Sequence, residues 1–249
     1  MSTYIKEVCY PNGALHVRSY YLRGKLHRAD GPAEEWFCEN GQLTAYEWHY
    51  DGNLHRLGAP ARESFYENGT LKEREWRQHT KRHREDGPAY EFFSDNGVCI
   101  DRTWYIHGKR HREDGPAQEL FHQDRNIRTN IWFIDGKYHR EDGPAVEAFY
   151  SNGTLEFYAW HKNGKYHRED GPSNERFRED GTVITRIWCR DGYRHRLDGA
   201  AIETFSQDGR CVFARYYLDG QSLPKIEHRR QAALQKLLAN HAANREVSL

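Results

Sequence analysis

The chain has 249 residues, of which 37% are apolar, 30% are charged and 14% are aromatic. Lysine and arginine together equal aspartate and glutamate at 37 each, so no net charge draws the protein onto nucleic acid or an anionic membrane. The low apolar share argues against a thick two-layer core and favours a thin, wide sheet whose apolar surface lies mainly in aromatic side chains.

The first ten residues, MSTYIKEVCY, contain no apolar run long enough for a signal peptide. No stretch approaches the ~20 apolar residues that a membrane-spanning helix needs. We therefore expect a soluble, cytoplasmic protein. The five cysteines show no C-x-x-C spacing and are odd in number, which favours reduced thiols over a zinc knuckle or a disulfide framework.

A unit of 28 residues repeats without insertion along most of the chain. It reads approximately W-x-x-[ND]-G-K-x-H-R-E-D-G-P-A-x-E-x-F-x-x-[ND]-G-x-L. The recurring histidines are His27, His55, His83, His111, His139, His167 and His195, and the recurring tryptophans are Trp48, Trp76, Trp104, Trp132, Trp160 and Trp188. We predict a partial repeat or cap over 1–19, tandem repeats over 20–223, and a helix with its tail over 224–249.

Each copy carries two turn signals, which in most copies are Asn-Gly or Asp-Gly dipeptides, as at Asn152-Gly153 and Asn163-Gly164. Between runs rich in aromatic and β-branched residues, these dipeptides are a strong hairpin signal, because both central residues of a type I′ turn take positive φ. Each repeat is therefore predicted to be a β-hairpin with connecting turns.

The segment PAVEAFY predicts a strand with the recurring Ala145, Glu147 and Phe149 on one face, which we expect to be the packed face. The following strand carries an aliphatic column at Leu155, and the Trp column follows five residues later, at Trp160. Because five is odd, a regular strand would place these two columns on opposite faces unless a bulge or bend intervenes. The sequence leaves the face of the Trp column open.

After Gly220 the repeat stops, and LPKIEHRRQAALQKLLANHAANRE (223–246) predicts an amphipathic helix. Its apolar residues in near-helical spacing are Ile226, Ala233, Leu234, Leu237 and Leu238. A helix laid on the last hairpin would cover the open edge of the sheet, which is the role we expect. The alternative is a basic amphipathic helix that lies on a membrane surface.

The unit W-x-x-N-G-K-x-H, followed by small residues, an aromatic strand and a second N-G, resembles the MORN repeat. It is most similar to the longer variant found in bacterial antitoxin-like proteins and in arrays in large DNA viruses of amoebae. The sequence departs from the standard repeat by replacing H-G-x-G with H-R-E-D-G-P-A. The resemblance implies an all-β fold, an elongated single-layer antiparallel sheet of tandem hairpins with a C-terminal capping helix. For a viral source it implies the host cytoplasm or the virion.

Taken alone, His139, Glu141 and Asp142 could be metal ligands or an acid–base set. Seven equivalent sites argue against catalysis, because an enzyme needs one desolvated pocket whose groups have matched pKa values. We therefore predict no enzyme activity, no catalytic or metal-ligating residue and no cofactor. A ladder that binds anions or metal ions at every copy is the alternative.

The segment HREDGPA is instead predicted to be a structural bend, in which Gly143 supplies an unusual φ. Arg140 should pair with Asp142 or with the recurring Glu147, which otherwise leaves a carboxylate on the packed face. His139 should donate to a neighbouring carbonyl or to that glutamate.

The candidate structural or interaction ladder consists of the recurring histidines and tryptophans together with Arg28, Arg140 and Arg168. Its tryptophans are expected to pack one hairpin on the next. Exposed aromatics along a groove could also bind an extended peptide or single-stranded nucleic acid, but the charge balance argues against nucleic acid. The function we predict is a non-enzymatic scaffold for a protein partner or for a second copy of the protein, including a homodimer. The alternative is a peripheral module that binds membrane lipid or phosphoinositide.

Overall fold

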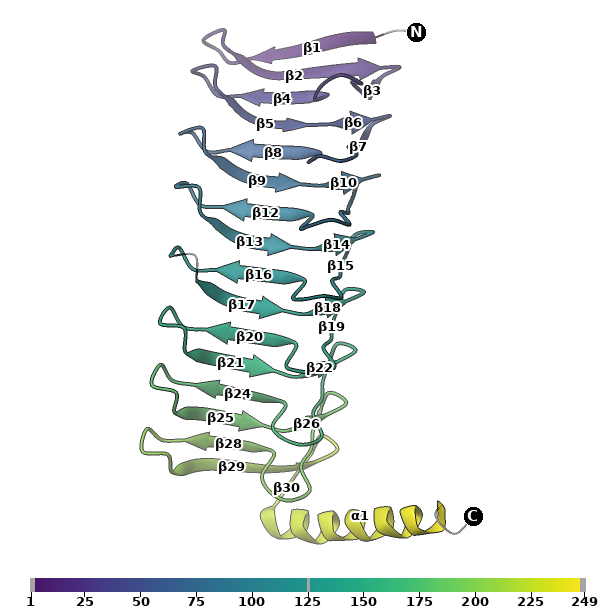
Figure 1. Cartoon of the computed structure of the whole chain (residues 1–249), viewed down its shortest axis with the longest axis vertical. Helices are drawn as coiled ribbons and strands as arrows, with labels where there is room; N and C mark the ends of the chain where they lie inside the picture. Colours follow the sequence, from purple (N-terminus) through teal and green to yellow (C-terminus); the bar gives the residue numbers. More distant parts are fainter. Residues whose placement is uncertain (1–2, 125, 247–249) are drawn as a thin grey trace. The chain divides into compact units, whose positions relative to one another are not determined.

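A computed structural model describes residues 3–124 and 126–246, and the chain divides into two compact units, Met1–Gly136 (unit 1) and Lys137–Leu249 (unit 2). In each unit the long strands follow one another in sequence order as an open antiparallel sheet (Figure 1). The predicted all-β class with a C-terminal helix is confirmed.

Unit 1 holds β1 (Thr3–Cys9), β2 (Leu15–Leu22), β3 (Lys25–Leu26), β4 (Glu34–Phe37), β5 (Leu43–Glu47), β6 (His49–Tyr50), β7 (Asn53–Leu54), β8 (Arg62–Phe65), β9 (Leu71–Glu75), β10 (Arg77–Gln78), β11 (Lys81–Arg82), β12 (Tyr90–Phe93), β13 (Cys99–Thr103), β14 (Tyr105–Ile106), β15 (Lys109–Arg110), β16 (Gln118–Phe121), β17 (Ile127–Ile131) and β18 (Phe133–Ile134). Unit 2 holds β19 (Lys137–Tyr138), β20 (Val146–Phe149), β21 (Leu155–Ala159), β22 (His161–Lys162), β23 (Lys165–Tyr166), β24 (Asn174–Phe177), β25 (Val183–Ile187), β26 (Cys189–Arg190), β27 (Tyr193–Arg194), β28 (Ile202–Phe205), β29 (Cys211–Leu218), β30 (Gln221–Leu223) and α1 (Lys225–Glu246).

Each complete repeat contains a long hairpin, a short hairpin and a connecting corner. In unit 2, β20 pairs with β21 in a long hairpin, β22 pairs with β23 in a short one, and β21 pairs with β24 of the next repeat. We call the segment from the recurring His to the recurring small residue a corner. The corners are corner 1 (27–33), corner 2 (55–61), corner 3 (83–89), corner 4 (111–117), corner 5 (139–145), corner 6 (167–173) and corner 7 (195–201).

The two turns of a repeat belong to different classes. At the short hairpin, Asn163 and Gly164 both have positive φ (51° and 85°), as a type I′ turn requires. At the long hairpin only Gly153 does (81°), and its N–H donates to the Tyr150 carbonyl at 2.9 Å, which makes a type I turn followed by a left-handed glycine. The type I′ prediction is therefore confirmed for the short hairpins and wrong for the long ones, where Asn152 caps the turn by accepting the Thr154 N–H at 2.9 Å.

Each long hairpin contains one β-bulge. In the hairpin of β20 and β21, Phe149 pairs with Leu155 and Ala148 pairs with Phe157, so Glu156 is the extra residue. The same shift falls at the equivalent position of the other long hairpins. Directly opposed residues share a face of the sheet. The bulge therefore shifts the alternation of side chains between the two faces by one residue. As a result, the Leu column and the Trp column both lie on the face of the recurring Glu and Phe.

A small residue at the end of each corner is fully buried. The members of this column are Ala33, Ala61, Ala89, Ala117, Ala145, Ser173 and Ala201, all 0% exposed. The Ala61 carbonyl accepts the Trp48 N–H at 2.7 Å, and the Ala61 N–H donates to the Glu75 carbonyl at 2.7 Å. The corner backbone thus lies between the strands of two repeats, where a larger side chain would not fit.

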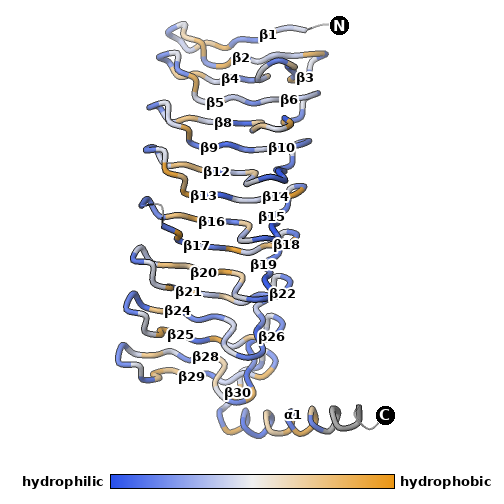
Figure 2. Tube along the Cα trace, viewed as in Figure 1, coloured by the Kyte–Doolittle hydropathy of each residue, from blue (hydrophilic) through white to orange (hydrophobic). Residues whose placement is uncertain are grey.

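The C-terminal helix α1 packs through a face that the sequence interpretation did not select. His228 and Ala232 are 2% and 3% exposed, and His228 Nε2 lies 2.7 Å from the Arg196 carbonyl oxygen of corner 7. In contrast, Ile226, Leu234 and Leu237 are exposed. The prediction that the apolar stripe packs on the last hairpin is therefore wrong, and hydrophobic residues are interspersed with hydrophilic ones along α1 (Figure 2). No helix among the described residues is long and apolar enough to cross a membrane.

Candidate functional site

The recurring Arg is the centre of each corner. In corner 4, Arg112 Nε donates to Asp114 Oδ1 at 2.8 Å, and Nη1 donates to the Pro116 carbonyl at 3.2 Å. Its Cζ lies 4.2 Å from the Trp104 ring centroid, and Nη1 is 3.4 Å from Glu119 Oε1. Hydrogen bonding to Arg112 lowers the pKa of Asp114 below its ordinary value. One guanidinium therefore joins the Trp column, the corner carboxylate and the recurring Glu.

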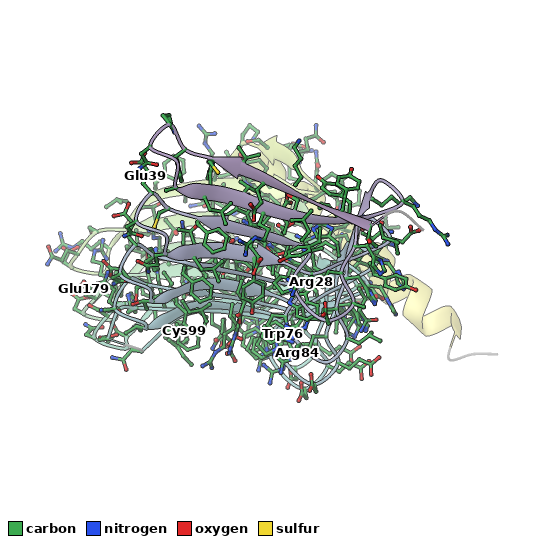
Figure 3. All side chains as sticks on the ribbon, turned by 90° about the horizontal axis from the view of Figure 1, so that it is seen from above. Arg28, Glu39, Trp76, Arg84, Cys99 and Glu179 are labelled. Carbon is green, nitrogen blue, oxygen red and sulfur yellow. The ribbon has the colours of Figure 1, made fainter. Side chains whose placement is uncertain are left out.

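The same contacts recur in both units. The Arg–Asp hydrogen bonds join Arg28 to Asp30, Arg84 to Asp86, Arg140 to Asp142, Arg168 to Asp170 and Arg196 to Asp198. The Arg–aromatic contacts join Arg28 to Tyr20, Arg56 to Trp48, Arg84 to Trp76, Arg168 to Trp160 and Arg196 to Trp188. Figure 3 shows Trp76 and Arg84 next to each other. Arg140 contacts both of its predicted partners, at 2.9 Å for Asp142 and 3.4 Å for Glu147.

The corner glycine leaves space for this Arg. Gly143 is not among the described residues with positive φ, so the prediction that it supplies an unusual φ is wrong. A Cβ at Gly143 would lie 2.6 Å from Arg140 Cζ, closer than real contacts allow. The guanidinium thus lies directly against the glycine Cα, whereas corner 2 holds Arg56 over Trp48 with Ala59 at the equivalent position.

Each ladder histidine binds the short-hairpin turn of the next repeat. His139 Nδ1 accepts the backbone N–H of Asn163 at 3.1 Å, and Gly164 N donates to the Tyr138 carbonyl at 2.8 Å. Equivalent N–H donors to the other ladder histidines are those of Asp51, His79, His107, Asp135, Asp191 and Asp219, at 3.1–3.2 Å. The sequence interpretation assigned His139 only a donor role, toward a carbonyl or Glu147, and missed this acceptor role of Nδ1. The ladder is built from contacts between consecutive repeats.

The outer surface of most corners carries exposed carboxylates. Glu141 and Asp142 of corner 5 are 92% and 83% exposed, and Glu169 and Asp170 of corner 6 are 84% and 81% exposed. The arginines beneath them are about three-quarters buried. The corner thus places its positive charge inside and its negative charge outside.

Two hollows lie between the corners of unit 2. One, of about 330 Å³, is lined by residues of corners 5 and 6 with Trp160 and His161. The other, of about 760 Å³, lies between corners 6 and 7 and is lined by Trp188, His195 and Lys236 of α1. Burial lowers the pKa of both His161 and His195, so both rings favour the neutral form.

The opposite face of unit 1 carries a buried charge network that the sequence interpretation missed. The Glu75 side chain is 4% exposed and accepts hydrogen bonds from Arg77 Nε and, at 2.7 Å, from Arg82 Nη2. Burial alone would raise the pKa of Glu75, but the two guanidinium groups hold it below its ordinary value. Burial raises the pKa of Tyr90, beside Arg82, to about 12. Burial also raises the pKa of Asp101.

One signal in the sequence could have located this network. The positions of Arg62 and Glu75 are occupied three repeats later by Val146 and Ala159. Charged residues at strand positions that are apolar in other copies mark a local departure from the common packing.

Glu34, Glu47 and His49 are the one group in the described part of the protein whose ligand atoms could surround a metal ion, all within 4.8 Å. Their carboxylates already have protein partners. Ser19 Oγ donates to Glu34 at 2.8 Å, and His49 Nε2 lies 2.9 Å from Glu47 Oε2. The group is therefore accounted for as part of the same polar network.

Comparisons with known proteins give little. No family model matches the chain, and no curated protein matches it. A match among solved structures is the crystal structure of TcdB2-TccC3 without its hypervariable C-terminal region, at 12% identity and a TM-score of 0.15. The match covers 85% of this chain and 14% of that chain, and at this TM-score it carries no argument. The resemblance to MORN repeats stays a prediction.

Proposed function

We propose that the protein is a non-enzymatic repeat scaffold that binds a basic, extended segment of a partner protein along the corners within a unit. The observation that supports this most directly is that each Glu-Asp corner buries an arginine beneath exposed carboxylates. Each Glu-Asp corner neutralises its own Arg beneath the surface and presents carboxylates that have room for an external cation. A strongly exposed negative row favours a positively charged partner and disfavours nucleic acid.

The spacing of the corners suggests the form of that partner. Neighbouring strands lie about 4.8 Å apart, so two strands per repeat place equivalent carboxylates about 10 Å apart. A polyproline II helix advances about 9 Å in its three-residue turn and projects every third side chain to the same side. A segment with Lys or Arg at every third residue would therefore meet one corner per turn.

A direct test uses the peptide (Lys-Pro-Pro)4 and the full-length protein at low ionic strength. We expect saturable binding by calorimetry that weakens with added salt, because the charges are exposed. The double variant E141Q/E169Q should bind several-fold more weakly, at about 0.5 kcal/mol per lost pair. The peptide (Glu-Pro-Pro)4 should not bind.

The matched control is E67Q/E179Q, which removes two exposed carboxylates at the long-hairpin turns, away from the corners. It should bind as the unchanged protein does. Equal losses in the two double variants would mean that only total charge matters and would refute a corner-specific site. Light scattering of the free protein separately tests self-association, the other form of the scaffold hypothesis.

The exposed stripe of α1 favours peripheral membrane binding as the second candidate. Ile226, Leu234, Leu237 and Leu238 are 77%, 57%, 57% and 61% exposed, and Arg230 is exposed among them. Apolar and basic side chains on one helix can enter the interface of an anionic membrane. Retention by vesicles containing phosphatidylserine or a phosphoinositide, lost in L234S/L237S, would support this function. No retention at low salt would exclude it.

A further inference from the structure

The hollow between corners 6 and 7 contains a buried polar atom without a partner. His195 has a side chain only 7% exposed, and its Nε2 makes no hydrogen bond within the described part of the protein. The ring lines the hollow of about 760 Å³ together with Trp188, Leu197, Arg190 and Lys236. A buried polar group without a partner is uncommon in native proteins and calls for a specific explanation.

Comparison of the corners shows which nearby group corner 7 lacks. In corners 3 to 6 the residue two positions after the ladder His is a glutamate, whose Oε1 lies 3.6–3.9 Å from the His Nε2. Corner 7 has Leu197 at that position. Corner 2 also has a leucine, Leu57, but His55 is less buried there, and its Nε2 is not among the buried unpaired atoms. Corner 1 has Ala29 at this position, and the Nε2 of His27 is not among the buried unpaired atoms either. Corner 7 therefore combines a buried, unpaired Nε2 with the absence of the carboxylate that lies 3.6–3.9 Å from the His in corners 3 to 6.

The hydrogen-bonding pattern assigns the proton to Nε2. His195 Nδ1 accepts the Asp219 N–H at 3.1 Å, the contact that all seven ladder histidines make. The Asp219 carboxylate, 2.8 Å from the same nitrogen, accepts from Arg190 at 2.7 Å and Gln235 at 3.2 Å. A neutral imidazole that accepts at Nδ1 carries its hydrogen on Nε2. In the tautomer that this shared backbone contact selects, the unpaired atom is a donor, whereas a proton on Nδ1 toward the Asp219 carboxylate would make it an acceptor.

Both signs of charge surround this donor, since Arg168, Arg190, Arg196 and Lys236 line the hollow together with Glu169, Asp170 and Asp198. Within the lining of the hollow, Asp170 and Asp198 are paired with corner arginines, while Lys236 of α1 makes no ion pair with a described residue. Lys225 and Arg229 of α1 line the adjoining hollow, which shares Arg196, Leu197 and Lys236 with the first. A negatively charged acceptor would find there the hydrogen-bond donor of His195 and the ammonium group of Lys236.

We propose that this hollow binds a peptide carboxylate, which accepts the Nε2–H of His195 and pairs with Lys236, in the place that a corner glutamate occupies in other repeats. Trp188 and Leu197 provide apolar contacts for the residue that carries the carboxylate. The carboxylate can come from a Glu side chain or from the carboxyl terminus of a peptide. This site is independent of the corner row proposed above, since it uses corner 7, which has no Glu, and a ligand of the opposite charge.

The test uses the full-length protein labelled with ¹⁵N-histidine, and long-range ¹H–¹⁵N spectra of the imidazoles. Four probes are titrated: acetyl-Leu-Glu amide, acetyl-Leu-Gln with a free C-terminus, acetyl-Leu-Gln amide and acetyl-Leu-Lys amide. The free protein should show His195 protonated at Nε2. One or both carboxylate probes should shift the His195 signals saturably, and which of them does identifies the source. The neutral and cationic probes should not.

The decisive variant is Leu197→Glu, which restores the glutamate of corners 3 to 6. It should lower the affinity for the carboxylate probe by about tenfold or more, because the new Glu side chain occupies the Nε2–H of His195. It should also raise the melting temperature. The matched control, Leu57→Glu at corner 2, should leave binding unchanged. Lys236→Gln, on the exposed surface of α1, should weaken binding several-fold without altering the backbone spectrum.

Three results would overturn the proposal. They are the absence of any shift with both carboxylate probes, a shift with the lysine probe, and full affinity in both Leu197→Glu and Lys236→Gln. Each of them would leave the corner-row hypothesis unaffected, because that hypothesis is tested with a basic peptide and with variants in corners 5 and 6.

Discussion

The guanidinium carbon of Arg84 lies 4.1 Å from the centroid of the Trp76 ring, and a Cβ at Gly87 would lie 2.9 Å from the same carbon. The Arg is thus held between an aromatic face and a backbone that has no side chain. Asp86 and the Pro88 carbonyl fix its two ends. The close approach of the Arg to this glycine recurs in six corners, and corner 2 has Ala59 in place of the glycine.

Gly87→Ala should destabilise unit 1 by about 1 kcal/mol, because the Arg84 guanidinium must shift away from the added methyl and loosen its hydrogen bond to Asp86. Urea unfolding measures the change. The double variant R84A/G87A provides the control, since without the Arg the added methyl has no clash. If the free-energy change of the double variant equalled the sum of the changes in R84A and G87A, the glycine would be required for a reason other than Arg84.

Thr80→Gly should stabilise the protein by about 1 kcal/mol. His79 and Thr80 occupy the short-hairpin turn with φ of 47° and 68°, a conformation that is unfavourable for a β-branched residue. The equivalent residue is glycine in the other copies. Thr154→Gly, at a residue not found with positive φ, should instead destabilise. A lower midpoint for Thr80→Gly in thermal or urea unfolding would contradict the strain argument.

Glu75→Gln should destabilise unit 1 by about 3 kcal/mol, because it leaves Arg77 and Arg82 largely buried without a counter-charge. Glu85→Gln is the control, since Glu85 is 85% exposed and its loss should change the free energy of unfolding by less than about 0.5 kcal/mol. Similar losses in the two variants would mean that the network does not depend on its buried charge.

His161→Phe should make the stability less dependent on pH between about 5 and 7. The ring stacks with Tyr138 at 5.0 Å and Tyr166 at 4.2 Å, and burial lowers its pKa. Below the ordinary histidine pKa of about 6.5, the unfolded state takes up a proton that the folded state does not. The free energy of unfolding therefore decreases as the pH is lowered from about 6.5 to the pKa of the folded state.

The substituted ring is tolerable because Phe133 occupies the equivalent position one repeat earlier. Urea unfolding at several pH values measures the slope. Part of the pH dependence should remain in this variant, because burial also lowers the pKa values of His195 and His55. A slope identical to that of the unchanged protein would show that His161 does not contribute.

Several features could be predicted from sequence because they are local. The hairpins follow from Asn-Gly and Asp-Gly dipeptides, and the pairing of Arg140 with Asp142 spans only two residues. The helix after Gly220 follows from the end of the period and from its composition. These interactions form between residues that are close in the sequence, so their spacing encodes them.

Other features depended on contacts between repeats or between elements, which a single repeat does not specify. The bulge at Glu156 decides the face of the Trp column, and the Nδ1 of His139 accepts from a residue 24 positions later. The close approach of Arg140, and not a positive φ, distinguishes Gly143. For α1, composition marked the apolar stripe, whereas contact with corner 7 decided that His228 and Ala232 pack.

By itself, then, the sequence determined a periodic all-β protein with a terminal helix, because hydrophobic period and turn chemistry act over a few residues. Only the tertiary structure decided which atoms are donors and acceptors, which face is covered and which corner lacks its partner. The physical reason is that the neighbouring repeat sets hydrogen-bond direction and burial. The sequence of one 28-residue unit does not specify its contacts with that neighbour.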